Sequence, residues 1–305
     1  MALQTYYSHG KLLLTGEYVV LDGAEALAVP TRFGQNLVVK EGKTKDLKWT
    51  SFDADKGIWF TDCITIDEVK NKLLSDQNSL VKNTLIEILF QANIQNPKVF
   101  ETGGYEIETH LTFPRNWGLG TSSTLINNIA QWFQIDAFEL LSNSFGGSGY
   151  DIACAQTDRP ILFQLIEEQP KFEEVSFNPS FKEHIYFVYL NQKQSSKLAI
   201  ANYLTQRHKS PAIISKINKI THQIITCNTL TEFAQLMEYH EILMSEVLET
   251  ITIKERFFYD FKGVVKSLGA WGGDFVMVIS SENPEQYFKD KGFDVLLQYD
   301  ELILH

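Results

Sequence analysis

The feature that most constrains the fold is a glycine-rich segment leading into a helical run, Pro114-Arg115-Asn116-Trp117-Gly118-Leu119-Gly120-Thr121-Ser122-Ser123 followed by residues 124–133. Gly118 and Gly120 permit positive φ angles and carry no Cβ, so backbone N–H groups can converge on an anion. The hydroxyls of Thr121, Ser122 and Ser123 then lie at a helix N-terminus, where unsatisfied amides and the helix dipole favour negative charge. The segment predicts a phosphate-binding turn between a strand and a helix.

A single turn of this kind also has a purely structural interpretation, because strand-to-helix connections commonly contain glycine and Ser or Thr caps. The spacing differs from the Gly-x-x-x-x-Gly-Lys-Ser/Thr pattern of a Walker loop, which excludes that class of nucleotide site. The rest of the chain therefore decides between a structural turn and an anion site.

Hydrophobic periodicity predicts an α+β chain. Apolar runs predict strands at residues 11–14, 18–21, 26–29, 105–111, 160–166, 184–190 and 275–279, and a pair of strands between 49 and 66. Helical spacing predicts helices at 79–92, 122–133 and 137–143, an almost wholly helical stretch at 195–266, and a helix followed by a strand between 284 and 297. His240 falls on the apolar stripe of the run 230–247, so we expect a packed core residue there.

Length and charge narrow the functional classes. A chain of 305 residues exceeds the usual size of one domain, so two domains are expected, with a boundary near residue 175. A net charge of −11, from 38 acidic and 27 basic residues, argues against nucleic-acid and anionic-membrane binding. Three widely spaced cysteines fit neither a zinc site nor a disulfide framework. Without a signal-peptide pattern or a long apolar run, the expected location is the cytoplasm, with no membrane contact.

Three further segments carry glycines at ordered positions. They are Gly10-Lys11-Leu12-Leu13-Leu14-Thr15-Gly16-Glu17-Tyr18, Gly147-Ser148-Gly149-Tyr150-Asp151-Ile152-Ala153 and Gly269-Ala270-Trp271-Gly272-Gly273-Asp274. Together with residues 114–123 they resemble, in order, the motifs of the GHMP small-molecule kinases, closest to the mevalonate kinase and phosphomevalonate kinase branch. The resemblance covers the chain from about residue 8 to residue 280.

The resemblance implies a two-domain α+β fold. Residues 1–175 would form an N-terminal ATP-binding domain with a left-handed βαβ crossover, and residues 176–305 a ferredoxin-like C-terminal domain. ATP and the acceptor would bind in the cleft between these domains, with Mg²⁺ entering on the nucleotide. The expected partner is a small anionic substrate, and a homodimer is left open.

The resemblance also assigns roles to individual residues. Asp151 would act as general base or orient the acceptor hydroxyl, and Lys11 would pair with Asp151 and stabilise charge on the phosphoryl group. For Asp151 the structural alternative is a turn carboxylate after Gly149. The expected ATP contacts are Pro114, Gly118, Leu119, Gly120, Thr121, Ser122 and Ser123. The expected substrate contacts are Glu17, Ser148, Gly149, Lys193, Ser195, Ser196, Gly272 and Gly273.

For the metal, position in the loop points to the Ser122 or Ser123 hydroxyl, with Ser122 as the preferred ligand. A glutamate about one helix upstream of the catalytic aspartate is implied as the second Mg²⁺ ligand, and Glu139 is the nearest candidate. Its alternative is a solvated helix carboxylate.

Several positions depart from the family pattern. Ser8-His9 stands where Ala-Pro is common, Thr124 replaces an alanine, and Trp271 replaces a glycine. Only 27 residues lie between Ser123 and Asp151, a short central segment.

The sequence therefore predicts an ATP-dependent kinase of the GHMP type that transfers the γ-phosphoryl group to a mevalonate-type acceptor, phosphomevalonate or mevalonate, in isoprenoid biosynthesis. The alternative is a non-catalytic protein of the same fold that binds a nucleotide or a prenyl phosphate. A decarboxylase of the same fold is disfavoured by the third motif, and a sugar kinase by the missing N-terminal sugar motif.

Overall fold

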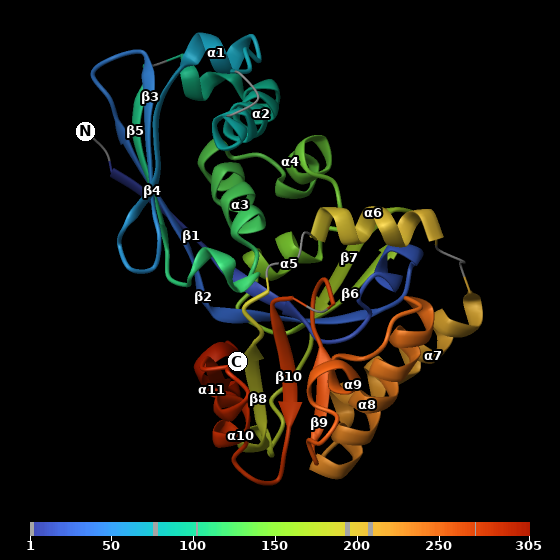
Figure 1. The fold of residues 1–305 in the computed structure, drawn as a ribbon. Coiled ribbons are helices and arrows are strands. Elements are labelled where there is room, and N and C mark those ends of the chain that lie inside the picture. The colour runs from blue at the N-terminus through green and yellow to red at the C-terminus, as the bar shows by residue number, and fades with distance from the viewer. Residues whose placement is uncertain (1–2, 76–78, 102, 193–195, 207–209, 272) are drawn as a thin grey trace. The chain divides into compact units, whose positions relative to one another are not determined.

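The computed structural model describes residues 3–75, 79–101, 103–192, 196–206, 210–271 and 273–305 (Figure 1). The chain forms two compact units. The first contains Met1–Gly10, Phe33–Arg115 and Leu119–Gln156, and the second contains Lys11–Arg32, Asn116–Gly118 and Thr157–His305. The division into domains 1–175 and 176–305 remains a prediction from the sequence.

A mixed sheet forms the base of the first unit. Its strands run in the order β4, β3, β5, β2, with β1 also paired to β2, and their bounds are β1 Leu3–Leu13, β2 Ala26–Glu41, β3 Asp46–Phe52, β4 Ile58–Thr65 and β5 Tyr105–Leu111. Strand β3 is antiparallel to β4 and parallel to β5. Because parallel neighbours need a crossover, the chain between them passes through helices.

Helices cover one face of this sheet (Figure 1). They are α1 Ile66–Lys70, α2 Leu80–Gln95, α3 Thr121–Phe133, α4 Ala137–Ser144 and α5 Tyr150–Gln156, with 3₁₀ turns at Pro97–Phe100 and Arg115–Trp117. Strand β5 alternates buried and exposed side chains, so that Ile107 faces the core while Glu108 faces solvent. Apolar residues of α2 and α3, such as Leu89 and Ile129, fill the space above the sheet.

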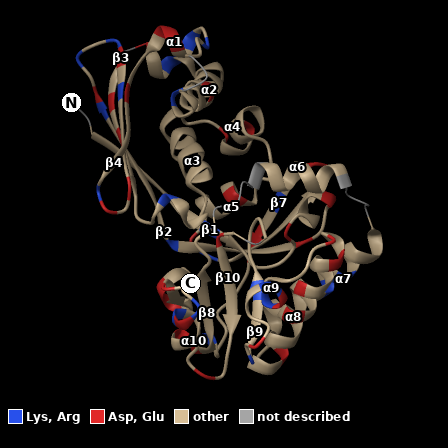
Figure 2. Ribbon diagram, in the orientation of Figure 1, with Lys and Arg blue, Asp and Glu red and all other residues tan. Residues whose placement is uncertain are grey.

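The second unit contains an antiparallel sheet in the order β11, β8, β10, β9. Its strands are β8 Ile185–Tyr189, β9 Val264–Ser267, β10 Phe275–Ile279 and β11 Leu296–Gln298. Two further strands, β6 Ile161–Ile166 and β7 Gln169–Glu174, continue the seven-stranded sheet of β1 to β5, because β6 pairs with the start of β2. Neither β8 nor β10 contains a charged residue (Figure 2).

The helices of the second unit are α6 Ser196–Gln206, α7 Pro211–Thr226, α8 Leu230–Val247, α9 Ile253–Phe257, α10 Glu285–Asp290 and α11 Tyr299–Leu302, with 3₁₀ turns at Val19–Asp22 and Lys182–His184. Val188, Val276, Phe258 and Phe288 belong to one buried core between the sheet and these helices. Among the described residues, no helix combines the length and apolarity needed to cross a bilayer.

Most of the predicted elements are confirmed, and two were wrong. Residues 18–21 were expected as a strand but form the 3₁₀ turn Val19–Asp22, because Gly16 and Tyr18 adopt positive φ angles of 81° and 60° that an extended strand cannot contain. The stretch 195–266 was expected to be almost wholly helical, but it ends in strand β9, whose apolar run pairs with β10.

Candidate functional site

The predicted phosphate-binding turn has the expected backbone. Gly118 and Gly120 adopt left-handed φ angles of 70° and 94°, and α3 begins directly afterwards at Thr121. The Ser123 side chain is buried and its hydroxyl donates to Gly120 O over 2.9 Å, whereas Ser122 is exposed. The turn therefore presents the Ser122 hydroxyl and the free first-turn amides of α3 to a ligand, while Ser123 stabilises the turn itself.

A cavity of about 230 Å³ adjoins this helix N-terminus inside the first unit. Its walls come from β2, β3, β4, β5, α2, α3 and the segment after α4. Its lining residues are Gln35, Trp49, Ser51, Trp59, Leu80, Val81, Thr84, Leu85, Ile88, Thr109, Thr121, Ser122, Leu125 and Phe145. Aromatic and aliphatic side chains form most of the surface, and the hydroxyl residues include Thr121 and Ser122 in the first turn of α3. Such a cavity suits a flat, partly apolar group attached to an anion.

Polar contacts orient the two tryptophans of the cavity. Trp49 Nε1 donates to Ser51 Oγ over 3.0 Å, and Thr109 Oγ1 donates to the same oxygen over 2.8 Å. The Trp59 ring lies 4.7 Å from the guanidinium of Arg115, which Asp53 holds through a 2.8 Å ion pair. Among the described residues, the buried Trp59 Nε1 has no hydrogen-bond partner, so it is a donor that a ligand could use.

The second glycine cluster leads into α5. Gly146, Gly147 and Gly149 all adopt positive φ angles. Asp151 is the second residue of α5 and is half-buried, and the amides of Ile152 and Ala153 close the first turn on Gly149 O. The predicted contacts Ser148 and Gly149 are buried just before this helix.

In the second unit, Lys11 lies near the end of β1 and is buried, with Nζ 3.5 Å from Gly118 O. A Cβ on Gly118 would lie 2.1 Å from the Asp274 carboxylate, so only glycine fits at that position. The neighbouring loop residues are also held, because Tyr189 donates to Asn116 O over 2.9 Å and Trp117 packs edge-on against Phe275. Burial, reinforced by the charge of Asp274, raises the pKa of Tyr189, which keeps its hydroxyl protonated as a donor.

The third glycine cluster has a left-handed backbone at Trp271, the position where this chain replaces a glycine of the family pattern. Trp271 adopts a φ angle of 49°, in the left-handed region that glycine occupies most easily. Its indole Nε1 is buried without a partner among the described residues. The tryptophan therefore follows the path that a glycine would take.

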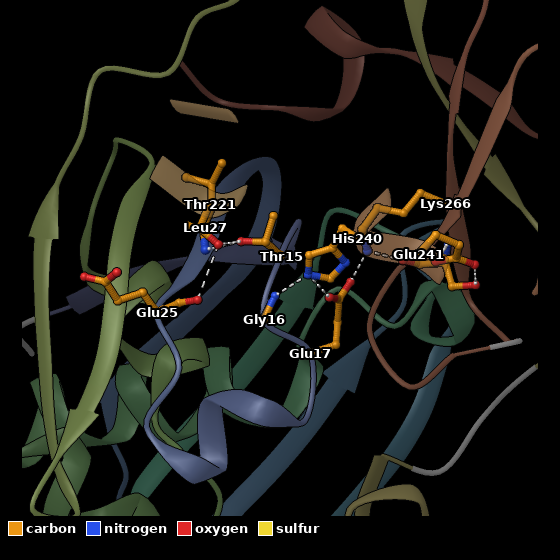
Figure 3. Close-up of polar contacts among 10 residues, drawn as sticks. Thr15, Gly16, Glu17, Glu25, Leu27, Thr221, His240, Glu241 and Lys266 are labelled. Carbon is orange, nitrogen blue, oxygen red and sulfur yellow. Dashed lines mark hydrogen bonds and ion pairs between the residues drawn. The ribbon is translucent and has the colours of Figure 1, made fainter. Parts of the chain in front are cut away.

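Glu17, expected as a substrate contact, lies in a buried cluster of charged residues in the second unit (Figure 3). Lys266 Nζ donates to Glu17 Oε1 and to Ser267 O. His240 Nε2 accepts from the amide of Gly16 over 3.0 Å and lies 3.7 Å from Glu17 Oε2. The predicted burial of His240 is confirmed.

Burial sets the charge state of this cluster. Desolvation raises the pKa of Glu17 even though Lys266 opposes it, and it lowers the pKa of His240, so the imidazole is neutral. The next residue, Glu241, accepts hydrogen bonds from the amide and hydroxyl of Ser267, and burial raises its pKa to about 7. The cluster joins the first motif to α8 and to β9, which leads into the third motif.

The remaining predicted site residues are dispersed. Glu139 is exposed in the first turn of α4, where its amide is capped by Asp136. Lys193, Ser195 and Gly272 lie outside the described residues, as does the side chain of Ser196. Within the described ranges, no group of three or more His, Cys, Asp or Glu side chains is arranged to hold a metal ion.

Sequence reasoning missed Lys266, Glu241 and Tyr189, and it named Asp274 in the third motif without predicting that its carboxylate lies against Gly118. The pairs Lys266–Glu17 and Tyr189–Asn116 join residues far apart in the chain, so no local pattern indicates them. Asp274 follows the third glycine cluster directly, and that position was the one available signal.

The sequence matches no family model, and no curated protein sequence matches it. Solved structures do match over the whole chain. Mevalonate kinase from Methanococcus jannaschii has a TM-score of 0.71 at 15% identity, covering 100% of this chain and 99% of that one. Streptococcus pneumoniae phosphomevalonate kinase, in complex with phosphomevalonate and AMPPNP, has a TM-score of 0.69 at 14% identity, covering 97% and 99%. Lactococcus lactis galactokinase complexed with galactose has a TM-score of 0.65 at 13% identity, covering 95% and 88%. These neighbours are GHMP kinases, and the chain has their α+β fold.

Proposed function

We propose that this chain, which has the GHMP kinase fold, is an ATP-dependent small-molecule kinase that phosphorylates a mevalonate-type acceptor, phosphomevalonate or mevalonate. The observation that carries the proposal is the cavity of about 230 Å³ beside the N-terminus of α3. It offers an apolar, aromatic space for a base next to a helix end that favours phosphate.

The residues present fit both ATP and Mg²⁺. The exposed Ser122 hydroxyl is a hard oxygen ligand at the phosphate-binding end of α3, and Mg²⁺ takes few protein ligands when phosphates and water supply the rest. Glu139 remains the proposed carboxylate ligand. When bound, Mg·ATP supplies the transferable phosphoryl group and neutralises part of its charge.

Each catalytic residue has a separate task. The buried ammonium of Lys11, held near Gly118 O, would stabilise negative charge that develops on the transferring group. Asp151 would accept the proton of an acceptor hydroxyl as the new P–O bond forms and the bond from the γ-phosphoryl group to ADP breaks, with ADP as the leaving group. With a phosphate acceptor little base catalysis is needed, and Asp151 would chiefly orient the attacking oxygen.

Acceptor recognition follows from the same proposal. Ser148 and Gly149 before α5, and Gly273 in the third cluster, supply backbone and hydroxyl donors suited to a small anion. Further proposed contacts with the acceptor are Lys193, Ser195, Ser196 and Gly272. Glu17 of the first motif is also proposed as a substrate contact.

The decisive experiment measures ATP consumption with Mg²⁺ against mevalonate, phosphomevalonate, galactose and a panel of amino-acid alcohols, with Asp151→Asn in parallel. We expect turnover on one mevalonate-type acceptor and its collapse in the variant. ATP binding without turnover on any acceptor would instead favour the non-catalytic binding protein. Turnover on galactose alone would reassign the acceptor to a sugar.

A further inference from the structure

A buried polar network fills the inner face of α3. Ser8 on β1, Gln35 on β2 and Thr124, Asn127 and Asn128 on α3 are all at most 2% exposed. The Ser8 hydroxyl donates to Asn128 Oδ1 and accepts from Asn127 Nδ2, both over 2.8 Å. Asn128 Nδ2 donates to Gln35 O over 2.9 Å, and Thr124 Oγ1 lies 2.9 Å from Gln35 Oε1.

The network includes two of the positions that depart from the family pattern, Ser8 and Thr124. Each replaces an alanine of that pattern, and each hydroxyl has a buried partner. An alanine at position 8 would leave Asn128 Oδ1 without its donor and would remove an acceptor of Asn127. Because an unpaired buried polar group is costly, the two substitutions and the asparagines form one interdependent set.

Asn127 extends the network to α5. Its Nδ2 lies 3.4 Å from Ala155 O, and its Oδ1 accepts from Gln156 Nε2 over 3.0 Å. Helices α3 and α5 also pack against each other (Figure 1). The same side chain thus ties the helix that begins at the phosphate turn to the last turn of the helix that carries Asp151.

We propose that Asn127 is a positioning residue, which fixes Asp151 relative to the phosphate-binding end of α3. The helix α5 spans only Tyr150–Gln156, and it follows three glycines with positive φ angles. A helix of two turns that follows three glycines has little intrinsic stability, so its position depends on tertiary contacts, including those at its C-terminal end. Asn127 provides polar contacts at that end. This inference rests on the proposed function of Asp151.

The test compares Asn127→Leu with the matched control Asn128→Leu. The two asparagines are adjacent and equally buried, and both bond to Ser8. Asn127 also contacts Ala155 O and Gln156 Nε2 on α5, whereas Asn128 donates to Gln35 O on β2. Amide hydrogen exchange of residues 152–156 is the first readout. We expect protection to fall about tenfold or more in Asn127→Leu and to be retained in Asn128→Leu, relative to α3 in each variant.

Kinetics on the purified protein give the second readout. In Asn127→Leu we expect kcat to fall about tenfold or more while KM for ATP stays within about twofold. Adding Asp151→Asn to Asn127→Leu should reduce kcat much less than it does in the unmodified protein, because both changes act on the same group. Asn128→Leu should retain kcat.

Three results would overturn the proposal: unchanged exchange of α5 in Asn127→Leu, an equal loss of kcat in both variants, or full additivity with Asp151→Asn. Failure of the proposed function is distinguishable, because the hydrogen-exchange comparison of Asn127→Leu with Asn128→Leu does not require phosphoryl transfer.

Discussion

Lys266 Nζ lies 2.5 Å from Glu17 Oε1, and neither side chain reaches solvent. The pair joins β9 to the segment after β1, two parts of the chain separated by 249 residues. Its charges are balanced only while both partners are present, so loss of either one leaves a buried charge without its partner.

Lys266→Met should destabilise the protein by roughly 3–5 kcal/mol, because it leaves the Glu17 carboxylate buried without a counter-charge. Chemical denaturation of the variant measures the loss. The double variant Glu17→Gln with Lys266→Met should recover part of it, and Lys289→Met, in an exposed pair with Glu285, should change little. A single variant as stable as the unmodified protein would contradict the assignment.

The stability contribution of Glu241 should depend on pH. Its pKa rises from 4.5 to about 7, first because of burial and also because of the charge of Glu17, while Lys266 and Ser267 oppose the rise. The folded state therefore holds a proton that the unfolded state has released, so the contribution is complete below pH 4.5 and is lost as pH rises through 7. The shift corresponds to roughly 3 kcal/mol.

Glu241→Gln should remove this dependence, because the amide reproduces the protonated carboxyl toward Ser267. Its free energy of unfolding, relative to the unmodified protein, should increase between pH 5 and pH 8 by a few kcal/mol at most. Denaturation curves at several pH values measure this difference, and a difference that is constant with pH would exclude Glu241 as the titrating group.

The sequence predicts the phosphate turn because the residues that determine its backbone are neighbours in the chain. Gly118, Gly120 and the hydroxyls at 121–123 determine the backbone and the helix start within ten residues, and strand β5 was predicted with its observed bounds. The 3₁₀ turn at Val19–Asp22 escaped prediction, since a run of Val-Val-Leu favours a strand unless the positive φ of Tyr18 is known. The buried charged cluster around Glu17 was not predicted, because Lys266 lies in an apolar strand and its partners are on distant segments of the chain.

Gly118→Ala should impair both stability and ATP binding. Its φ angle of 70° costs about 1 kcal/mol for a residue with a Cβ. The clash with Asp274 at 2.1 Å adds roughly 1–3 kcal/mol. Gly146→Ala is the matched control, because Gly146 has a φ of 71° and no atom within 4 Å of the added Cβ. Equal losses in the two variants, by thermal or chemical unfolding, would mean that Asp274 does not restrict Gly118.

Filling the cavity should weaken nucleotide binding without unfolding the protein. Thr84 lies on α2, lines the cavity and is exposed, so Thr84→Trp adds bulk at its wall. We expect ATP affinity to fall about tenfold or more in a calorimetric titration. Ile94→Trp, an exposed position on the same helix that does not line the cavity, should leave affinity unchanged. Retained affinity in Thr84→Trp would place the base elsewhere.

The interleaving of the two compact units limits how this chain can be divided. Each unit draws on three separate segments, and no single cut of the polypeptide separates them. A truncation after Gln156, for example, would separate the buried residues Leu14 and Leu27 from Thr157–His305, the largest segment of their own unit. Exchange of a continuous gene segment that spans residues of both units would therefore alter both cores at once.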